Sequence, residues 1–551
     1  MTSAARRHPA VDVCVVGSGA GGLPVATRLA QRGFRVVIVE RGPWMSRSDF
    51  LEDELLMRRA MFWPTVEEEP RTWRPSDQVP ATPLPTASQL FANAMVVGGG
   101  TVHYSALAWR FRESDFRVLS EDGAVDGASL ADWPITYGEL EPYYTQAEWE
   151  LGVSGDTRLN PFEPPRSRDY PLPPVPRNSA GAILERGARA LGLHPFPIPL
   201  AILSRDYDGR SRCMAKGFCS SYGCPNGARS STMEAYLPKG MATGRLELRP
   251  GCFVTRVETD VRGRATGVAY IAPDGTTQLQ EAGLVILAAG GVETTRVLLL
   301  SATAAHPDGL ANGSGLVGKN FMQHSPPATV LATFPHPVDG HMGTAATRTV
   351  MDWYATDTSR GYIRGGFAQP RSHGGDPIEY ALRPVHPAGW GLAHKASMRE
   401  TWRHYLLSHV TGESLPVEAN RVDLDPVVRD RFELPVARIT YAAHENDVRL
   451  ATWIADRSAE LFEVAGATRV YNAGPVDRKI HNHQMGTARM GDDPARSVVD
   501  RWCRTHEVPN LYVADSSVFV TSAGLNPSLT ITANALRIAD RIAATRGDAK
   551  A

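Results

Sequence analysis

"VDVCVVGSGAGGLPVATRLAQRGFRVVIVE", residues 11 to 40, decides the fold of this chain. An apolar run, a glycine-rich turn, a helical pattern and a second apolar run follow one another, which is typical of two buried parallel strands joined by a helix. Gly17, Gly19 and Gly22 form GxGxxG in that turn, and Glu40 ends the second run. The glycines permit a tight turn, the approach of a pyrophosphate and close helix packing, while Glu40 would accept ribose hydroxyls. The stretch predicts a dinucleotide site, the alternative being a structural glycine turn, and it leaves FAD or NAD open.

The composition is that of an ordinary globular enzyme. The 551 residues are enough for two or three packed domains. The formal net charge of -1 does not indicate the positively charged surface that binds nucleic acid or an anionic membrane, so we expect a small-molecule partner. No apolar run approaches the roughly 18 residues that span a bilayer, and we see neither a signal-peptide pattern nor a secreted disulfide framework among the six cysteines. We therefore predict a cytoplasmic protein without a direct membrane span, and an oligomer is compatible with these features.

Strand and helix patterns continue along the chain. Residues 246–289 carry β patterns with Asp274-Gly275 as a hairpin turn, and residues 326–475 mix strands, helices and aromatic residues, consistent with a second domain. The end of the chain predicts a buried strand, a loop and an amphipathic helix after Asn526-Pro527, with Ser528 able to cap it. A flavoprotein whose distant segments return to one flavin explains this length better than a simple nicotinamide dehydrogenase.

Several longer motifs resemble those of one enzyme family. They are "NAMVVGGGTVHYSALAWRF" (93–111), "LVILAAGGVETTRVLLLS" (284–301), "GLVGKNFMQH" (315–324), "HNHQMGTARMG" (481–491) and "LYVADSSVFVTSAGLNPSLTITANALRIADRI" (511–542). Together, from residue 11 to about 542 and in family order, they are similar to the glucose-methanol-choline (GMC) FAD-dependent oxidoreductases. "RDRFELPVARITYAAHEND" (429–447) and the loop "GCPNGA" (223–228) resemble the pyranose 2-oxidase and gluconate dehydrogenase-like branch.

The resemblance implies an α/β fold in which a Rossmann-like FAD-binding domain of the GMC and p-hydroxybenzoate hydroxylase-like type carries a second domain on an antiparallel sheet. The FAD-binding domain would be discontinuous, residues 1–325 and 476–551 with a lid or insert at about 111–229, and residues 326–475 would bind substrate. Val254 would contact adenine through its backbone, and Asp515 would lie near the pyrophosphate and ribityl chain. The implied FAD-binding positions are Gly17, Gly19, Gly22, Glu40, Gly98, Gly99, His103, Val254, Asp515 and Asn526.

Alcohol oxidation needs a base for the hydroxyl proton, and neutral histidine titrates in the right range. In GMC enzymes the base is the first residue of H-x-x-G-T, and counting back from Gly486 identifies His483, with Asn526 as its partner. Two polar residues satisfied within a loop are the structural alternative. His481 has the weaker claim, since a packing role or a substrate contact fits it better, and we expect His481→Ala to leave measurable activity.

His103 lies four residues after Gly99, the spacing at which some GMC oxidases attach the flavin 8α-methyl group to histidine. The resemblance therefore implies two states of His103, a covalent 8α-histidyl-FAD or a histidine packed beside the ring.

Cys213, Cys219 and Cys224 have the spacing C-x5-C-x4-CP in a glycine-rich loop. Three thiolates can hold a [3Fe-4S] cluster, and the loop resembles that of membrane-tethered glucose and fructose dehydrogenases, although its last spacing is one residue longer. Plain thiols in a structural loop are the expected state, and a zinc site is a further alternative.

We expect FAD-dependent oxidation of a CH-OH group of a sugar, glycoside or polyol, with electrons passing to O2 or another acceptor. Aromatic residues of the expected substrate domain would stack on a sugar ring or belong to the core, among them Trp353, Tyr354 and Trp390. The rival functions are a tailoring oxidase for a secondary-metabolite alcohol and a redox-silent lyase of the hydroxynitrile lyase type.

Overall fold

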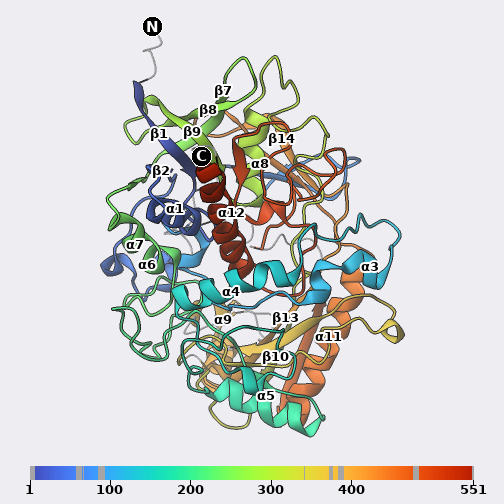
Figure 1. Ribbon diagram of the computed structural model, residues 1–551. Coiled ribbons are helices and arrows are strands. Elements are labelled where there is room, and N and C mark those ends of the chain that lie inside the picture. Colours follow the sequence, from blue (N-terminus) through green and yellow to red (C-terminus); the bar gives the residue numbers. More distant parts are fainter. Residues whose placement is uncertain are drawn as a thin grey trace.

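The computed structural model describes residues 6–548 except 58–61, 63–64, 66, 85–93, 341, 372–376, 383–389 and 476–482. Figure 1 shows a body that holds β1, β2, α1, α8 and α12, and a second body that holds β10, β13, α5 and α11. α4 crosses between the two bodies, beside α12. None of the described helices combines the length and the apolar character needed to cross a bilayer.

The first body is built on a seven-stranded sheet. Its order is β6-β2-β1-β9-β8-β7, and β17 pairs with β9 off this path. The strands β1, β2, β6, β9 and β17 run parallel to one another. β8 pairs antiparallel with β9, and β7 antiparallel with β8. Their bounds are β1 Arg6–Val16, β2 Val36–Val39, β6 Leu246–Arg249, β7 Phe253–Thr259, β8 Ala265–Ile271, β9 Thr277–Leu287 and β17 Leu511–Val513.

The predicted βαβ unit is confirmed, and β1 begins earlier than expected. Residues 13–16 and β2 are buried, as continuous apolar strands require. Residues 6–8 also pair with β9, beyond a bulge between His8 and Val11, because β9 extends past the apolar run. The predicted turn at Asp274-Gly275 joins β8 to β9, with Gly275 at φ +79°.

Three helices pack together beside the parallel strands of the first body. α1 Gly22–Gln31 and α4 Tyr137–Leu151 lie beside α12 Ser528–Asp548. Arg28 of α1 pairs with Asp540 at 2.8 Å, and the Tyr144 hydroxyl of α4 lies 2.7 Å from that of Thr530. The predicted C-terminal helix is therefore held by charge and hydroxyl contacts as well as by its apolar face.

The second body confirms the expected antiparallel sheet. The order is β12-β13-β10-β16, from β10 Ala328–Thr333, β12 Gly366–Arg371, β13 Tyr405–Gly412 and β16 Arg469–Pro475. α11 Glu445–Val464 packs on one face, and α5 Ser179–Ala190 packs against α11. Part of the insert predicted at 111–229 thus lies on this body.

A four-stranded sheet joins distant segments, in the order β14-β15-β3-β4. β3 Thr72–Arg74 and β4 Thr82–Pro83 meet β14 Arg421–Arg429 and β15 Pro435–Thr440. Val422 and Ile439 share an apolar cluster with Val292 of α8 Gly291–Leu300, so this part of 326–475 packs on the first body. The domain boundaries stay a prediction.

The remaining elements are short connections. They are α2 Glu54–Leu56, α3 Val118–Asp122, β5 Phe196–Pro197, α6 Thr232–Ala235, α7 Leu237–Met241, β11 Arg348–Thr349, α9 Pro377–Ala381 and α10 Leu392–Thr401.

Candidate functional site

A cleft opens where β1, β2 and β9 end, the edge at which parallel α/β sheets bind ligands. Chain segments from five further regions close around it. Among the predicted site residues, the cleft is lined by Gly17, Gly19, Glu40, Gly99, Val254, Asp515 and His483. Gly22, Gly98, His103 and Asn526 are not part of that lining. The sequence-predicted positions therefore converge on one cleft, with four of them behind or beside it.

The glycines fit a bound dinucleotide. A Cβ at Gly19 would meet nothing within 4 Å, so its backbone faces open space that a pyrophosphate can enter. A Cβ at Gly22 would lie 2.0 Å from the Gly17 carbonyl oxygen, which shows that α1 starts directly against the turn. Gly17 itself has φ +95°, a conformation that side chains rarely adopt. The cradle has the form that the fingerprint predicts.

Two buried carboxylates organise the cleft. Glu40 accepts hydrogen bonds from the Ser18 amide at 2.9 Å, the Ser18 hydroxyl at 2.6 Å and the Gly42 amide at 2.7 Å. Asp515 accepts from the Gly290 amide at 2.8 Å and the Thr294 hydroxyl at 2.5 Å. Loss of hydration on burial raises the pKa of both carboxyl groups. Each carboxylate therefore ties loops of the cleft together.

His483 and Asn526 meet at one end of the cleft. Asn526 Nδ2 lies 3.4 Å from His483 Nε2 and donates to it when that nitrogen carries no proton. Asn526 Oδ1 is buried without a hydrogen-bond partner among the described residues, and so are both amide atoms of Gln484. Buried polar atoms of this kind are what a bound molecule satisfies. His481 lies outside the described residues.

His324 is a site residue that the sequence reasoning missed. Its buried ring lies across that of His483, with centroids 4.8 Å apart and an interplanar angle of 83°. Reciprocal hydrogen bonds of 2.9 Å between Met322 and Met485 bring the two histidine segments together. His324 is the last residue of the motif "GLVGKNFMQH". Its position beside His483 follows only from the pairing of Met322 with Met485, which the sequence does not indicate.

The first residues of α12 reach the cleft. Ser528 and Ile531 line it together with the preceding Pro527, so the amino-terminal end of the helix faces the cleft. A helix end of this kind carries partial positive charge and favours an anion.

Comparison with known proteins identifies the family. The GMC oxidoreductase family is matched by its N-terminal model over residues 38–326 and by its C-terminal model over residues 416–535. The chain belongs to the GMC oxidoreductase family. A model of NAD(P)-binding Rossmann-like domains also matches residues 15–50.

The relatives of this GMC oxidoreductase are similar along nearly the whole chain. It is 36% identical over 539 residues to the 2-methyl-1,2-propanediol dehydrogenase of Mycolicibacterium austroafricanum, covering 96% of this chain and 95% of the relative. It is 29% identical to the fructose dehydrogenase large subunit of Gluconobacter japonicus, with 96% and 97% covered. A structure of Aspergillus oryzae formate oxidase, studied for its FAD modification, matches with a TM-score of 0.66 at 16% identity, over 99% of this chain and 100% of that one.

These comparisons confirm the predicted family, the fold class and the oxidoreductase class. They also support FAD as the cofactor, and the glycine cradle and the unpartnered polar atoms of the cleft fit it.

His103 is buried behind the cleft wall, which includes residues 99–101. Its ring stacks on Phe62 with a centroid distance of 5.3 Å. Loss of hydration, with a smaller contribution from the Arg229 guanidinium, lowers the pKa of His103 to about 3. The imidazole is therefore neutral at physiological pH.

The three loop cysteines are free thiols. The described part of the chain contains no group of three or more His, Cys, Asp or Glu side chains arranged to hold a metal ion. Burial raises the pKa of Cys213 to about 11, and Arg229 donates a hydrogen bond to the Cys219 carbonyl. Arg229 also donates to the Tyr222 carbonyl, so its guanidinium holds the backbone between Cys219 and Cys224. The iron-sulfur and zinc alternatives for this loop stay predictions.

Two of the three candidate stacking aromatics belong to the core. Trp353 packs edge-on against Trp453 at 5.7 Å, and the buried Tyr354 hydroxyl donates to Asp115 at 2.9 Å. Trp390 is 91% exposed.

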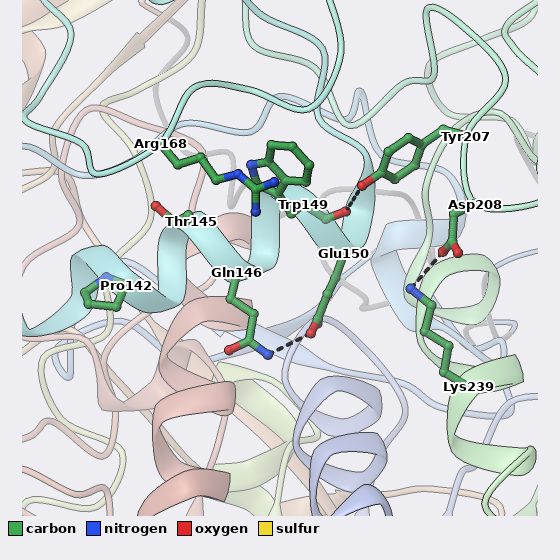
Figure 2. A pocket seen from close by; sticks show the side chains of 9 residues that line it. All are labelled: Pro142, Thr145, Gln146, Trp149, Glu150, Arg168, Tyr207, Asp208 and Lys239. Carbon is green, nitrogen blue, oxygen red and sulfur yellow. Dashed lines mark hydrogen bonds and ion pairs between the residues drawn. The ribbon is translucent and has the colours of Figure 1, made fainter.

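A separate depression of about 610 Å³ lies on the side of α4 and shares no residue with the cleft (Figure 2). Lys239 and Asp208 form an ion pair of 2.7 Å there, and Gln146 donates a hydrogen bond of 2.7 Å to Glu150. Arg168 stacks over the Trp149 ring, 3.0 Å from its centroid. The depression contains none of the predicted site residues, so the cleft remains the candidate active site.

Proposed function

We propose that this GMC oxidoreductase oxidises a CH-OH group of a polyol, sugar or glycoside to a carbonyl, using FAD. The observation that carries the proposal is the His483–Asn526 pair, 3.4 Å apart at one end of the dinucleotide cleft. The named activities of the relatives, on a diol and on fructose, support the substrate class.

The proposed chemistry assigns one role to each member of the pair. Neutral His483 takes the hydroxyl proton of the substrate as general base, and Asn526 holds the alcohol oxygen with its amide. When bound, FAD supplies the acceptor for the hydride that leaves the same carbon. The amino-terminal end of α12 would favour the negative charge that then accumulates at this end of the cleft.

The further parts of the proposal concern the cofactor and the acceptor. His103 would bind the flavin covalently, and its neutral imidazole is in the state that can form such a bond. O2 or another acceptor would take the electrons. A cytoplasmic location and self-association stay predictions.

Anaerobic flavin absorbance near 450 nm tests the function. We expect a polyol or sugar from a panel to bleach the flavin of the wild-type protein, and His483→Ala to reduce the bleaching rate about 100-fold or more with flavin retained, because general-base catalysis contributes about 10² to 10⁴-fold. His306→Ala is the matched control, since His306 lies beside Glu507 and outside the cleft lining.

Two outcomes would contradict the proposal. A fully active His483→Ala enzyme removes the assigned base. A flavin that stays oxidised with every alcohol, while a cyanohydrin is cleaved, favours the redox-silent lyase.

A further inference from the structure

The sheet of the second body packs one face on α11, and part of its other face packs on Tyr380 of α9 and Trp402 after α10. Leu406 and Val410 of β13 and Ala368 of β12 share an apolar cluster with Leu450 and Ile454 of α11. Because side chains alternate along a strand, the residues between them point to the opposite face.

That opposite face carries a polar strip across three strands. Gln369 of β12 lies directly opposite His409 of β13, and His409 lies opposite Thr329 of β10. Directly opposite residues have their Cβ atoms about 4.5 to 5.5 Å apart, so the three side chains are neighbours.

Gln369 is a buried polar residue whose side-chain carbonyl forms no hydrogen bond within the described part of the protein. It is 3% exposed, and its Oε1 has no hydrogen-bond partner among the described residues. Trp109, which packs edge-on at 5.8 Å against Phe367 on the same face, likewise has a buried indole N–H without a partner in the described chain. A buried unsatisfied polar group costs about 1–3 kcal/mol, which a ligand hydroxyl would recover.

The strip begins near the catalytic pair. A Cβ at Gly524, two residues before Asn526, would lie 3.4 Å from the Gly366 Cα, and Gly366 starts β12. The Ser325 amide, next to His324, donates to the Gly412 carbonyl at the end of β13. Gln369 is three residues from Gly366 and His409 three residues from Gly412, which places the strip about 10 Å along the strands. An extended six-carbon polyol and the Gln369 side chain together span that distance.

We propose that Gln369, flanked by His409 and Thr329, recognises a second hydroxyl of the substrate, remote from the carbon that is oxidised. This specificity position makes the enzyme selective for polyhydroxylated alcohols over monohydroxy alcohols of the same length. The inference rests on the proposed function, since it assumes that His483 and Asn526 hold the reacting hydroxyl.

The test compares 1,6-hexanediol with 1-hexanol by anaerobic flavin bleaching. We expect the wild-type enzyme to prefer the diol, and Gln369→Met to lower the bleaching rate per substrate concentration about 10- to 100-fold for the diol while leaving the 1-alkanol unchanged. Gln369→Asn should restore part of the preference. Calorimetric titration of the diol into enzyme with chemically reduced flavin measures the same loss as binding alone.

Ser408→Ala is the matched control, since the Ser408 hydroxyl is buried and unpartnered among the described residues but shares the face that packs on α11. It should keep the diol preference.

Methionine removes an unsatisfied polar group, so the melting temperature of Gln369→Met should stay equal or rise. Equal losses for diol and 1-alkanol, or none for either, overturn the inference alone. A wild-type flavin that no alcohol bleaches overturns the proposed function and this inference together.

Discussion

At the scale of single residues, burial keeps the His103 imidazole neutral. An imidazole with a pKa of about 3 stays neutral at any working pH, and the spacing of His103 from Gly99 resembles that of relatives with a histidyl-linked flavin. We therefore expect the yellow chromophore of the wild-type protein to stay in the pellet after acid precipitation, and His103→Ala to release it into the supernatant. His306→Ala should behave as wild type. A yellow supernatant from the wild-type protein would rule out the covalent bond.

The sequence predicted those site residues whose roles depend on local spacing. Gly19 and Glu40 follow from a fingerprint within one βαβ unit, and His483 from its place in the motif that resembles those of GMC enzymes. All three line the cleft. His324 and Gln369 could not be found in this way. The neighbour of His324 is set by the pairing of Met322 with Met485, and the face of Gln369 by the register of β12 on β13.

At the scale of elements, Gly19 and Gly21 in the turn before α1 have different surroundings. A Cβ at Gly21 would lie 1.6 Å from the Ala514 carbonyl oxygen, whereas a Cβ at Gly19 would enter open space. We expect Gly21→Ala to lower the unfolding free energy by about 1–3 kcal/mol or more, because the backbone after β17 must move. Gly19→Ala should leave thermal unfolding of the flavin-free protein unchanged and lower the flavin content per chain, because its methyl group occupies the pyrophosphate space.

Thermal melting of the flavin-free proteins and the ratio of flavin to protein absorbance separate the two effects. Equal behaviour of the two variants would contradict this account of the turn.

Element patterns predicted the parallel core but not every partner. The apolar runs of β1 and β2 identify two buried strands that pair with each other inside one βαβ unit. β15 instead pairs with β3 in parallel, joining Arg438 to Thr72 across the chain. No periodicity in either segment encodes a partner that distant, so the sheet packed on α8 was not foreseen.

At the scale of the whole molecule, a buried charge network joins the insert, the second body and the catalytic loop. Arg364 pairs with Asp115 of the insert, and with Glu413 after β13 at 2.7 Å. Tyr354 donates to Asp115 and accepts from the Gly524 amide at 3.2 Å. The loop that carries Asn526 is thus fastened to both bodies through groups removed from water.

This network predicts how stability depends on pH. Burial, opposed by Arg364 and reinforced by Asp115, raises the pKa of Glu413 from 4.5 to about 7, and Asp122 and Tyr354 also face the cluster. The folded protein then binds more protons than the unfolded chain between these values, so the contribution of Glu413 to stability is lost as pH rises from about 4.5 to 7. The glutamine of Glu413→Gln is neutral at every pH, so this variant does not lose stability in this way.

The unfolding free energy of Glu413→Gln relative to that of wild type should therefore increase by on the order of 3 kcal/mol between pH 4.5 and 7 and stay level above pH 7. Thermal midpoints of both proteins across that range check the prediction, and a difference independent of pH would show that Glu413 is ionised in the folded protein throughout.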